Sequence, residues 1–252
     1  MKTKLFILSF GCGGTSYLTQ EAIKALQESQ VVVAYSKYAR ELEVFLNNKE
    51  LIVSGMTYEK TRCQEAIQSA KAGKTTAILS NGDANIFGIA SMLLQHLDEE
   101  NLWEDIEVIT LAGITSFLAV ASKVGAFLSD IALLNFSTKF NDFETIKKRF
   151  EACMENDFTI GIYNPKSKKK TIVYDYFLET LEKYEERIVV VASNVGRQKE
   201  QITLTSTKAL IQQGNDNALI GMATLIIICN KTTALTHNGL INSGYLSEIS
   251  TS

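Results

Sequence analysis

The stretch KLFILSFGCGG, residues 4–14, decides the fold class. Its largely apolar part, residues 5–10, has the length of a β-strand and is typical of a strand buried on both faces of a parallel sheet. The glycine-rich residues 11–14 follow at once, and glycine lets a backbone approach a ligand closely. Because open α/β sheets bind ligands beyond the carboxyl ends of their strands, this stretch predicts an α/β domain with a ligand-binding loop.

The rest of the first half alternates strands with helices. Three further β-branched runs predict buried strands at residues 31–35, 75–80 and 106–110. Between them, residues 18–29 place apolar side chains on one face at helical spacing. Residues 59–72 end at Gly73, and glycine commonly terminates a helix. This alternation favours an α/β fold.

The second half has a different pattern. Short apolar runs predict strands at residues 131–137, 158–163, 187–193, 200–206 and 224–230. The last of these follow each other through short polar turns such as residues 194–199, which predicts a mixed sheet with antiparallel pairs. We therefore expect two αβα lobes, with a mostly parallel first sheet, a mixed second sheet and the active site in the cleft between them. The expected domains are residues 1–113 and 114–252.

Composition and charge exclude several classes of protein. The chain has 252 residues, of which 46% are hydrophobic and 21% charged, so it can bury a substantial core. Its formal net charge of -3 argues against a protein that coats nucleic acid, because such proteins normally carry a basic surplus.

The sequence also predicts where the protein resides. The first apolar run resembles the start of a signal peptide, but it ends in glycines, and a first β-strand explains it better. No stretch approaches the roughly 18 apolar residues of a membrane span. Cys12, Cys63, Cys153 and Cys229 lie far apart without a CxxC pair, so we expect neither a zinc site nor a disulfide framework. A cytoplasmic protein with reduced thiols and no bound metal or membrane partner is the prediction.

Two more glycine-containing loops follow predicted strands, at residues 81–85 and 112–116. In a parallel sheet all three loops lie at the carboxyl edge. The dinucleotide-binding fingerprint is absent, because residues 15–17 supply no third glycine in register after Gly14. Asp83 in the second loop fits a ligand contact, and it equally fits the N-cap of the following helix.

Taken together, the loops resemble those of the tetrapyrrole methylase family. The family motifs are matched by SFGCGGTSYLT at residues 9–19, SNGDANIFG at 80–88 and AGITS at 112–116. Three more stretches are similar to the precorrin-3B C(17)-methyltransferase branch, VSGMT at 53–57, YNPKS at 163–167 and ASNVGR at 192–197. The resemblance continues through residues 224–227 to 244–245 and so covers nearly the whole chain.

The resemblance implies an enzyme that transfers a methyl group from S-adenosylmethionine to carbon 17 of a cobalamin-pathway macrocycle, with contraction of the ring. It also implies a homodimer. A methyl sulfonium needs little acid or base help, so no acid or base residue is assigned. The implied cofactor contacts are Gly82, Asp83, Ile86, Thr115, Ser116, Asn164, Asn194, Val195 and Thr224.

The expected substrate is a tetrapyrrole, with or without cobalt. A corrinoid carries many carboxylate arms, so the lysine-rich residues 166–170 fit a steering patch in an acidic protein, although a solvated helix start would look the same. The residues expected to bind substrate are Gly11, Cys12, Gly13, Lys166, Lys168 and Arg197.

Four departures from the family motifs leave alternatives open. Cys12, Gly14, Ala84 and Ala112 stand where the family has proline, aspartate, proline and proline. A degenerate member that binds ligand with little activity is therefore one alternative. Another is a sibling methylase that acts on a different ring carbon. A third, a methylase of ribosomal RNA, is disfavoured by the acidic balance and by YNPKS.

Overall fold

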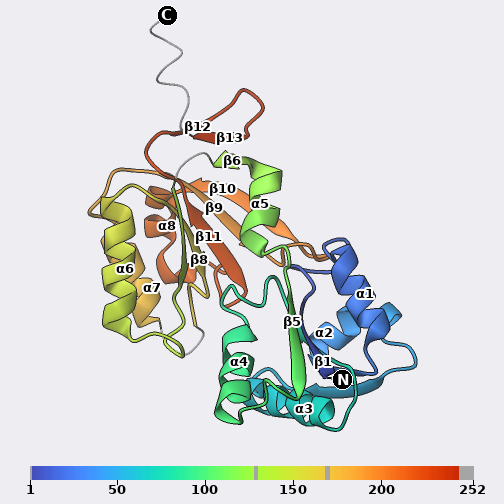
Figure 1. Ribbon diagram of the computed structural model, residues 1–252. Helices are drawn as coiled ribbons and strands as arrows, with labels where there is room; N and C mark the ends of the chain where they lie inside the picture. Colours follow the sequence, from blue (N-terminus) through green and yellow to red (C-terminus); the bar gives the residue numbers. More distant parts are fainter. Residues whose placement is uncertain (1, 128–129, 168–170, 244–252) are drawn as a thin grey trace, which may run out of the picture. The chain divides into compact units, whose positions relative to one another are not determined.

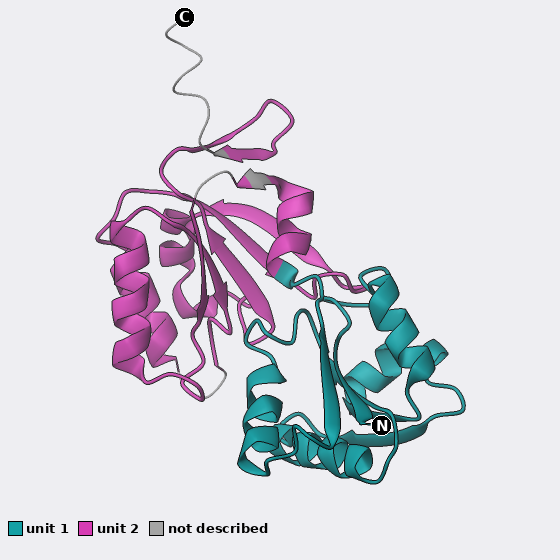
Figure 2. Cartoon of the chain, viewed as in Figure 1, with its two compact units in different colours: residues 1–116 teal, residues 117–252 magenta. Residues whose placement is uncertain are grey.

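The computed structural model describes residues 2–127, 130–167 and 171–243. The chain divides into two compact units, Met1–Ser116 and Phe117–Ser252 (Figure 2). Each unit contains its own five-stranded sheet with helices, which confirms the predicted α/β fold. The domain limits 1–113 and 114–252 and the placement of the active site stay predictions. Lys168 and residues 244–245 lie outside the described residues.

The sheet of the first unit is entirely parallel, with strand order β3-β2-β4-β1-β5. Its strands are β1 (Thr3–Ser9), β2 (Val31–Tyr35), β3 (Glu50–Ser54), β4 (Thr76–Ser80) and β5 (Ile106–Leu111). Because β1, β4 and β5 are neighbours, the three glycine-containing loops that follow them meet at one edge, as the sequence predicted.

Helices cover both faces of this sheet, which explains why its central strands are apolar throughout. On one face, Leu5 and Ile7 of β1 pack against helices α3 (Glu59–Lys71) and α4 (Ala90–Glu99). On the other face, Phe6 and Leu8 of β1 pack in a cluster with residues of α1 (Gln20–Glu28). The short helices α2 (Ser36–Glu41) and η1 (Glu43–Phe45) follow β2 in the chain.

The sheet of the second unit is mixed, with strand order β10-β9-β11-β8-β7. Its strands are β7 (Ile131–Asn135), β8 (Thr159–Tyr163), β9 (Ile188–Ser193), β10 (Gln201–Ser206) and β11 (Thr224–Ile228). Only the β7 and β8 pair is parallel, because β9 turns directly into β10 and β11 runs antiparallel to both of its neighbours. The antiparallel pairs predicted from the short polar turn are thereby confirmed.

Helices lie on both faces of this second sheet (Figure 1). Ile160, Ile162 and Ile226 face one core, shared with α6 (Phe143–Glu155), α7 (Ile172–Leu181) and α8 (Thr207–Gln213). The short helix η2 (Gly214–Asp216) follows α8. On the opposite face, α5 (Ser116–Val124) packs its Phe117 ring on Gly161 of β8. A small third sheet joins β6 (Gly125–Phe127), β12 (Thr233–Leu235) and β13 (Ile241–Ser243).

The sequence analysis did not predict β3 or the third sheet. β3 is an edge strand whose Leu51 and Val53 are 45% and 50% exposed, and its apolar run, residues 51–53, is only three residues long. Strands of three residues, as in the third sheet, are too short for a periodic pattern to develop.

None of the four cysteines forms a disulfide bond with another described residue, and burial raises the pKa of Cys63 and of Cys229 to about 12. None of the helices in the described part of the chain combines the length and the apolar character that crossing a bilayer requires.

Candidate functional site

Three loops of the first unit are bonded together at the carboxyl edge of its sheet. The Gly11 N–H donates to the Gly82 carbonyl oxygen at 3.1 Å, and the Gly82 N–H donates to the Gly11 carbonyl oxygen at 2.7 Å. The third loop packs so closely that a Cβ added to Gly113 would lie 2.2 Å from the Gly82 oxygen and 2.5 Å from the Ser9 Cβ. Only glycine fits at residue 113, so the third loop can pack this closely on the second only with glycine at that position.

Asp83 joins the second loop to the third. Its Oδ2 accepts from the Gly113 N–H at 2.9 Å, and its Oδ1 accepts from the Asn85 N–H at 2.8 Å and from Asn85 Nδ2 at 3.0 Å. The alternative that Asp83 caps the next helix is wrong, because α4 begins at Ala90 and its N-cap, Ile89, makes no side-chain cap hydrogen bond. The buried Ser9 adds a second link, since its Oγ accepts from the Ala84 N–H at 2.8 Å.

The remaining predicted cofactor contacts of this unit lie at the same edge. A Cβ on Gly82 would be 3.7 Å from the Thr115 Cα, and Thr115 is buried. Ser116 follows as the first residue of α5. The Ile86 N–H donates to the Asp83 carbonyl oxygen at 3.1 Å. The first unit therefore brings together all five of its predicted cofactor residues.

The second unit has a comparable edge. Thr224, at the start of β11, pairs with Ser193 at the end of β9, and Leu225 pairs with Tyr163 at the end of β8. The predicted contacts Asn164 and Asn194 follow those two strand ends directly, both with positive φ values, 55° and 51°. Asn164, Asn194, Val195 and Thr224 are thus grouped at one edge of the second sheet.

The Thr224 side chain is already engaged within its own loop. Its hydroxyl donates to the Leu219 carbonyl oxygen at 2.8 Å and accepts from the Gly221 N–H at 3.0 Å. These two hydrogen bonds fix the loop that leads into β11, residues 219–224. A ligand contact at Thr224 would therefore use the backbone or share the hydroxyl.

The turn that carries Asn194 and Val195 is held by Glu200, which the sequence analysis missed. Glu200 Oε2 accepts from the Gly196 N–H at 2.6 Å, and Oε1 lies 2.5 Å from the Lys123 Nζ of α5. Burial opposes ionisation of this carboxyl, but the hydrogen bonds from Lys123 and from the Gly196 N–H outweigh it and lower the pKa of Glu200. The carboxylate therefore stabilises the turn and ties it to α5.

Tyr163 and Asn135 also went unrecognised in the sequence. The Tyr163 hydroxyl accepts from the Phe117 N–H at 3.2 Å and so satisfies a free donor at the start of α5. Asn135, at the end of β7, accepts a hydrogen bond from Asn164 Nδ2 at 2.9 Å. The tyrosine lies within a quoted motif, but neither residue belongs to a spacing that indicates its partner.

The residues predicted to bind substrate differ in their exposure and in their contacts. Gly11 and Gly13 lie in the first loop with positive φ values, while Cys12 between them is 1% exposed. The Lys166 ammonium donates to the Asn215 carbonyl oxygen and lies 5.3 Å from the centre of the Tyr174 ring. Arg197 is half-buried in the turn after Asn194. Lys168 lies outside the described residues.

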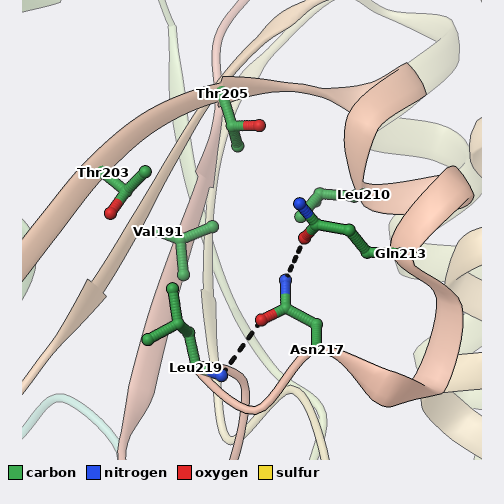
Figure 3. Close-up of a pocket in the computed structure, with 7 residues that line it drawn as sticks. All are labelled: Val191, Thr203, Thr205, Leu210, Gln213, Asn217 and Leu219. Atoms are coloured by element: carbon green, nitrogen blue, oxygen red, sulfur yellow. Dashed lines mark hydrogen bonds between the residues drawn. The ribbon is translucent and has the colours of Figure 1, made fainter.

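A small cavity occurs elsewhere in the second unit (Figure 3). It has a volume of about 50 Å³, and its polar lining includes Thr203, Thr205, Gln213 and Asn217. Small-molecule pockets usually measure about 300 to 1,000 Å³, so this cavity suits only a few water molecules. None of the predicted site residues lines it.

Fold comparisons show that the chain shares the fold of solved methyltransferases. The chain matches the crystal structure of the methyltransferase CobJ with a TM-score of 0.86 and 24% identity, over 96% of this chain and 100% of that one. It matches a uroporphyrin-III C-methyltransferase from Thermus thermophilus, solved with S-adenosylhomocysteine, with a TM-score of 0.65 and 16% identity, over 90% and 92% of the two chains. At these identities the likeness shows the fold.

Sequence comparisons give the family. The model for Tetrapyrrole (Corrin/Porphyrin) Methylases matches residues 4–211. A cobalt-factor III methyltransferase of Priestia megaterium is 33% identical over 92% of this chain, which spans 43% of that protein's length. A probable cobalt-factor III C(17)-methyltransferase of Salmonella typhimurium is 34% identical over 91% of this chain and 93% of its own length. The chain belongs to the tetrapyrrole methylases, which confirms the resemblance seen in its motifs.

The close approach at Gly113 gives a first prediction. Gly113→Ala forces a Cβ into the Gly82 carbonyl and the Ser9 side chain, so we expect the free energy of unfolding to fall by about 1 to 3 kcal/mol in urea denaturation. Gly221→Ala is the matched control, because a Cβ at residue 221 would meet no described atom within 4 Å. Equal stability of the two variants would contradict the interlocked loops.

The lowered pKa of Glu200 gives a second prediction. A carboxyl whose folded-state pKa is depressed stabilises the protein above its ordinary pKa of 4.5 and loses that contribution as pH falls through the folded-state value. Glu200→Gln should therefore have a lower melting temperature than the wild type at neutral pH, and the difference should shrink as the pH falls below 4.5.

The measurement is a thermal melt at a series of pH values, with Glu185→Gln as the exposed control. A melting-temperature difference for Glu200→Gln that does not change with pH would show that the carboxylate charge contributes nothing to holding the turn.

Proposed function

We propose that this chain transfers a methyl group from S-adenosylmethionine to carbon 17 of a precorrin or cobalt-factor macrocycle, with ring contraction, in cobalamin biosynthesis. The observation that carries the proposal is the match to a probable cobalt-factor III C(17)-methyltransferase over 93% of that relative's length. The branch motifs at residues 163–167 and 192–197 support it, because both lie at one edge of the second sheet. We further propose a cytoplasmic homodimer, as the sequence predicted.

Nine residues are proposed to hold the cofactor. In the first unit, backbone groups of the interlocked loops lie at the carboxyl edge, where α/β sheets bind ligands, and the Asp83 carboxylate supplies negative charge that suits a sulfonium cation. In the second unit, residues at the strand ends offer amide and backbone groups. The proposed contacts are Gly82, Asp83, Ile86, Thr115, Ser116, Asn164, Asn194, Val195 and Thr224.

The bound cofactor supplies an electrophilic methyl group that needs no proton transfer for its activation. The work of the chain is then to bind and orient the two reactants and to exclude water. Fixed loops suit this task, since Asp83, Ser9 and Glu200 all hold backbone N–H groups in place before any ligand arrives. No residue is assigned the role of acid or base.

The substrate is proposed to bind through its carboxylate arms. The residues proposed for this contact are Gly11, Cys12, Gly13, Lys166, Lys168 and Arg197. The Lys166 ammonium has three N–H donors, so it can contact a substrate carboxylate while it keeps its hydrogen bond to the Asn215 carbonyl. A substrate carboxylate carries a full negative charge, so its ion pair with the Lys166 ammonium would favour substrate binding.

At two of the four departures from the family motifs, Ala84 and Ala112, the first-unit loops are held by hydrogen bonds. Ala84 stands at a proline position, yet its N–H donates to Ser9 Oγ, a bond that proline could not make. Ala112 precedes Gly113, whose N–H is held by Asp83. These contacts keep the loops ordered for ligand binding, and turnover is what separates an active enzyme from a degenerate ligand-binding member.

The test combines ligand binding with turnover. Asp83→Ala and Thr115→Val should each weaken S-adenosylhomocysteine binding by about 1 to 3 kcal/mol in calorimetric titration, because each removes a polar partner at the proposed site. Asp142→Ala is the control, since Asp142 also accepts from a backbone N–H, that of Thr145, but at the start of α6. The wild type should methylate cobalt-factor III once, as seen by mass spectrometry.

Three results would contradict the proposal. Unchanged affinity in both Asp83→Ala and Thr115→Val would overturn the cofactor contacts. Binding without methyl transfer would favour the degenerate member. Methylation of uroporphyrinogen III in place of cobalt-factor III would favour a sibling methylase.

A further inference from the structure

Asn135 holds the side chain of Asn164 at the edge of the second sheet. The two residues lie on neighbouring parallel strands, since Asn135 pairs in register with Tyr163, the residue before Asn164. Asn135 is 7% exposed, and its Oδ1 accepts two hydrogen bonds, from the Ser137 N–H at 3.0 Å and from Asn164 Nδ2 at 2.9 Å.

The backbone fixes which way both amides point. A backbone N–H can only donate, so the Asn135 group that faces Ser137 must be its carbonyl oxygen. The same oxygen faces Asn164, which must therefore present its Nδ2. The Ser137 N–H is certain to be a donor, so this chain of two hydrogen bonds determines which amide atom is oxygen and which is nitrogen in both asparagines.

One consequence is a free acceptor on Asn164. Its Nδ2 is used by Asn135, and none of the residues that the structure describes donates to its Oδ1. Asn164 also has a φ of 55°, in the left-handed region that asparagine tolerates better than most residues. Backbone and side chain are thus both constrained, while one oxygen stays available.

From this geometry we propose that Asn135 is a positioning residue for the cofactor, and that Asn164 Oδ1 accepts a hydrogen bond from an N–H or O–H group of S-adenosylmethionine. The inference rests on the proposed function. The cofactor has three such donors, the 6-amino group of adenine, the ribose hydroxyls and the α-ammonium group. A ligand acceptor at this position is disfavoured, because two facing acceptors leave both without a partner.

The first experiment compares variants of Asn135. Asn135→Leu removes the acceptor and frees the Asn164 amide to rotate, so S-adenosylhomocysteine binding should weaken about tenfold. Asn135→Asp keeps an oxygen that accepts from both Ser137 and Asn164, and binding should stay within about threefold of the wild type. Because Asp would also restore a purely structural role, the melting temperature of each variant is measured beside its affinity.

Asn230→Leu is the matched control. Asn230 is also 7% exposed, lies just beyond a strand, and makes two side-chain hydrogen bonds, with Thr232 and Thr233. Its loss should lower the melting temperature about as much as Asn135→Leu while leaving S-adenosylhomocysteine affinity unchanged. Equal loss of affinity in Asn230→Leu and Asn135→Leu would overturn the proposal.

The second experiment identifies the ligand donor with three analogues of S-adenosylhomocysteine. They carry an oxo group in place of the 6-amino group, lack the α-amino group, or lack a ribose hydroxyl. The analogue without the relevant donor should bind the wild type about tenfold more weakly than the parent, and should bind Asn164→Ala no more weakly than the parent does. Fully additive effects for all three analogues would overturn the proposal.

The failure of this inference is distinct from failure of the proposed function. A wild-type protein that does not bind S-adenosylhomocysteine contradicts both. A wild-type protein that binds it, with Asn135→Leu binding equally well, contradicts the role of Asn135 alone.

Discussion

The candidate site depends first on the Asp83 carboxylate, which fixes the distance between the loops that follow β4 and β5, the strands on either side of β1. Its two oxygens accept from the Gly113 N–H and from Asn85, so one side chain stabilises both loops. This bond is within reach only because residue 113 has no Cβ and can pack on the Gly82 carbonyl. A carboxylate and a glycine, about thirty residues apart in sequence, thus determine the shape of the edge where an α/β sheet binds its ligand.

The second unit stabilises its edge by the same means with different residues. Glu200 accepts from the Gly196 N–H, and Asn135 accepts from the Ser137 N–H, so in each case a side-chain oxygen satisfies a loop donor. The loops of both units are ordered by contacts within the protein, before any cofactor binds. Preorganisation of this kind suits methyl transfer, which depends on the alignment of two reactants more than on proton transfer.

Much of the fold could be predicted from the sequence, because buried strands have continuous apolar runs and the glycine loops follow them directly. The candidate site residues of the first unit were predicted from loops that resemble those of the tetrapyrrole methylases. Ser9, Asn135 and Glu200 were missed as bonding partners because their roles depend on pairing between segments distant in sequence. The N-cap role considered for Asp83 failed for a related reason, since its partner Gly113 comes from another loop.

The central claim is the proposal that the cofactor contacts the ordered loops of each unit. Hydrogen–deuterium exchange with and without S-adenosylhomocysteine tests it most directly, because it reports each loop separately. The account predicts slower exchange on binding at residues 81–86 and 113–117 in the first unit and at residues 194–197 in the second. Binding that leaves these segments unchanged, or that protects residues 203–219 around the small cavity, would contradict it.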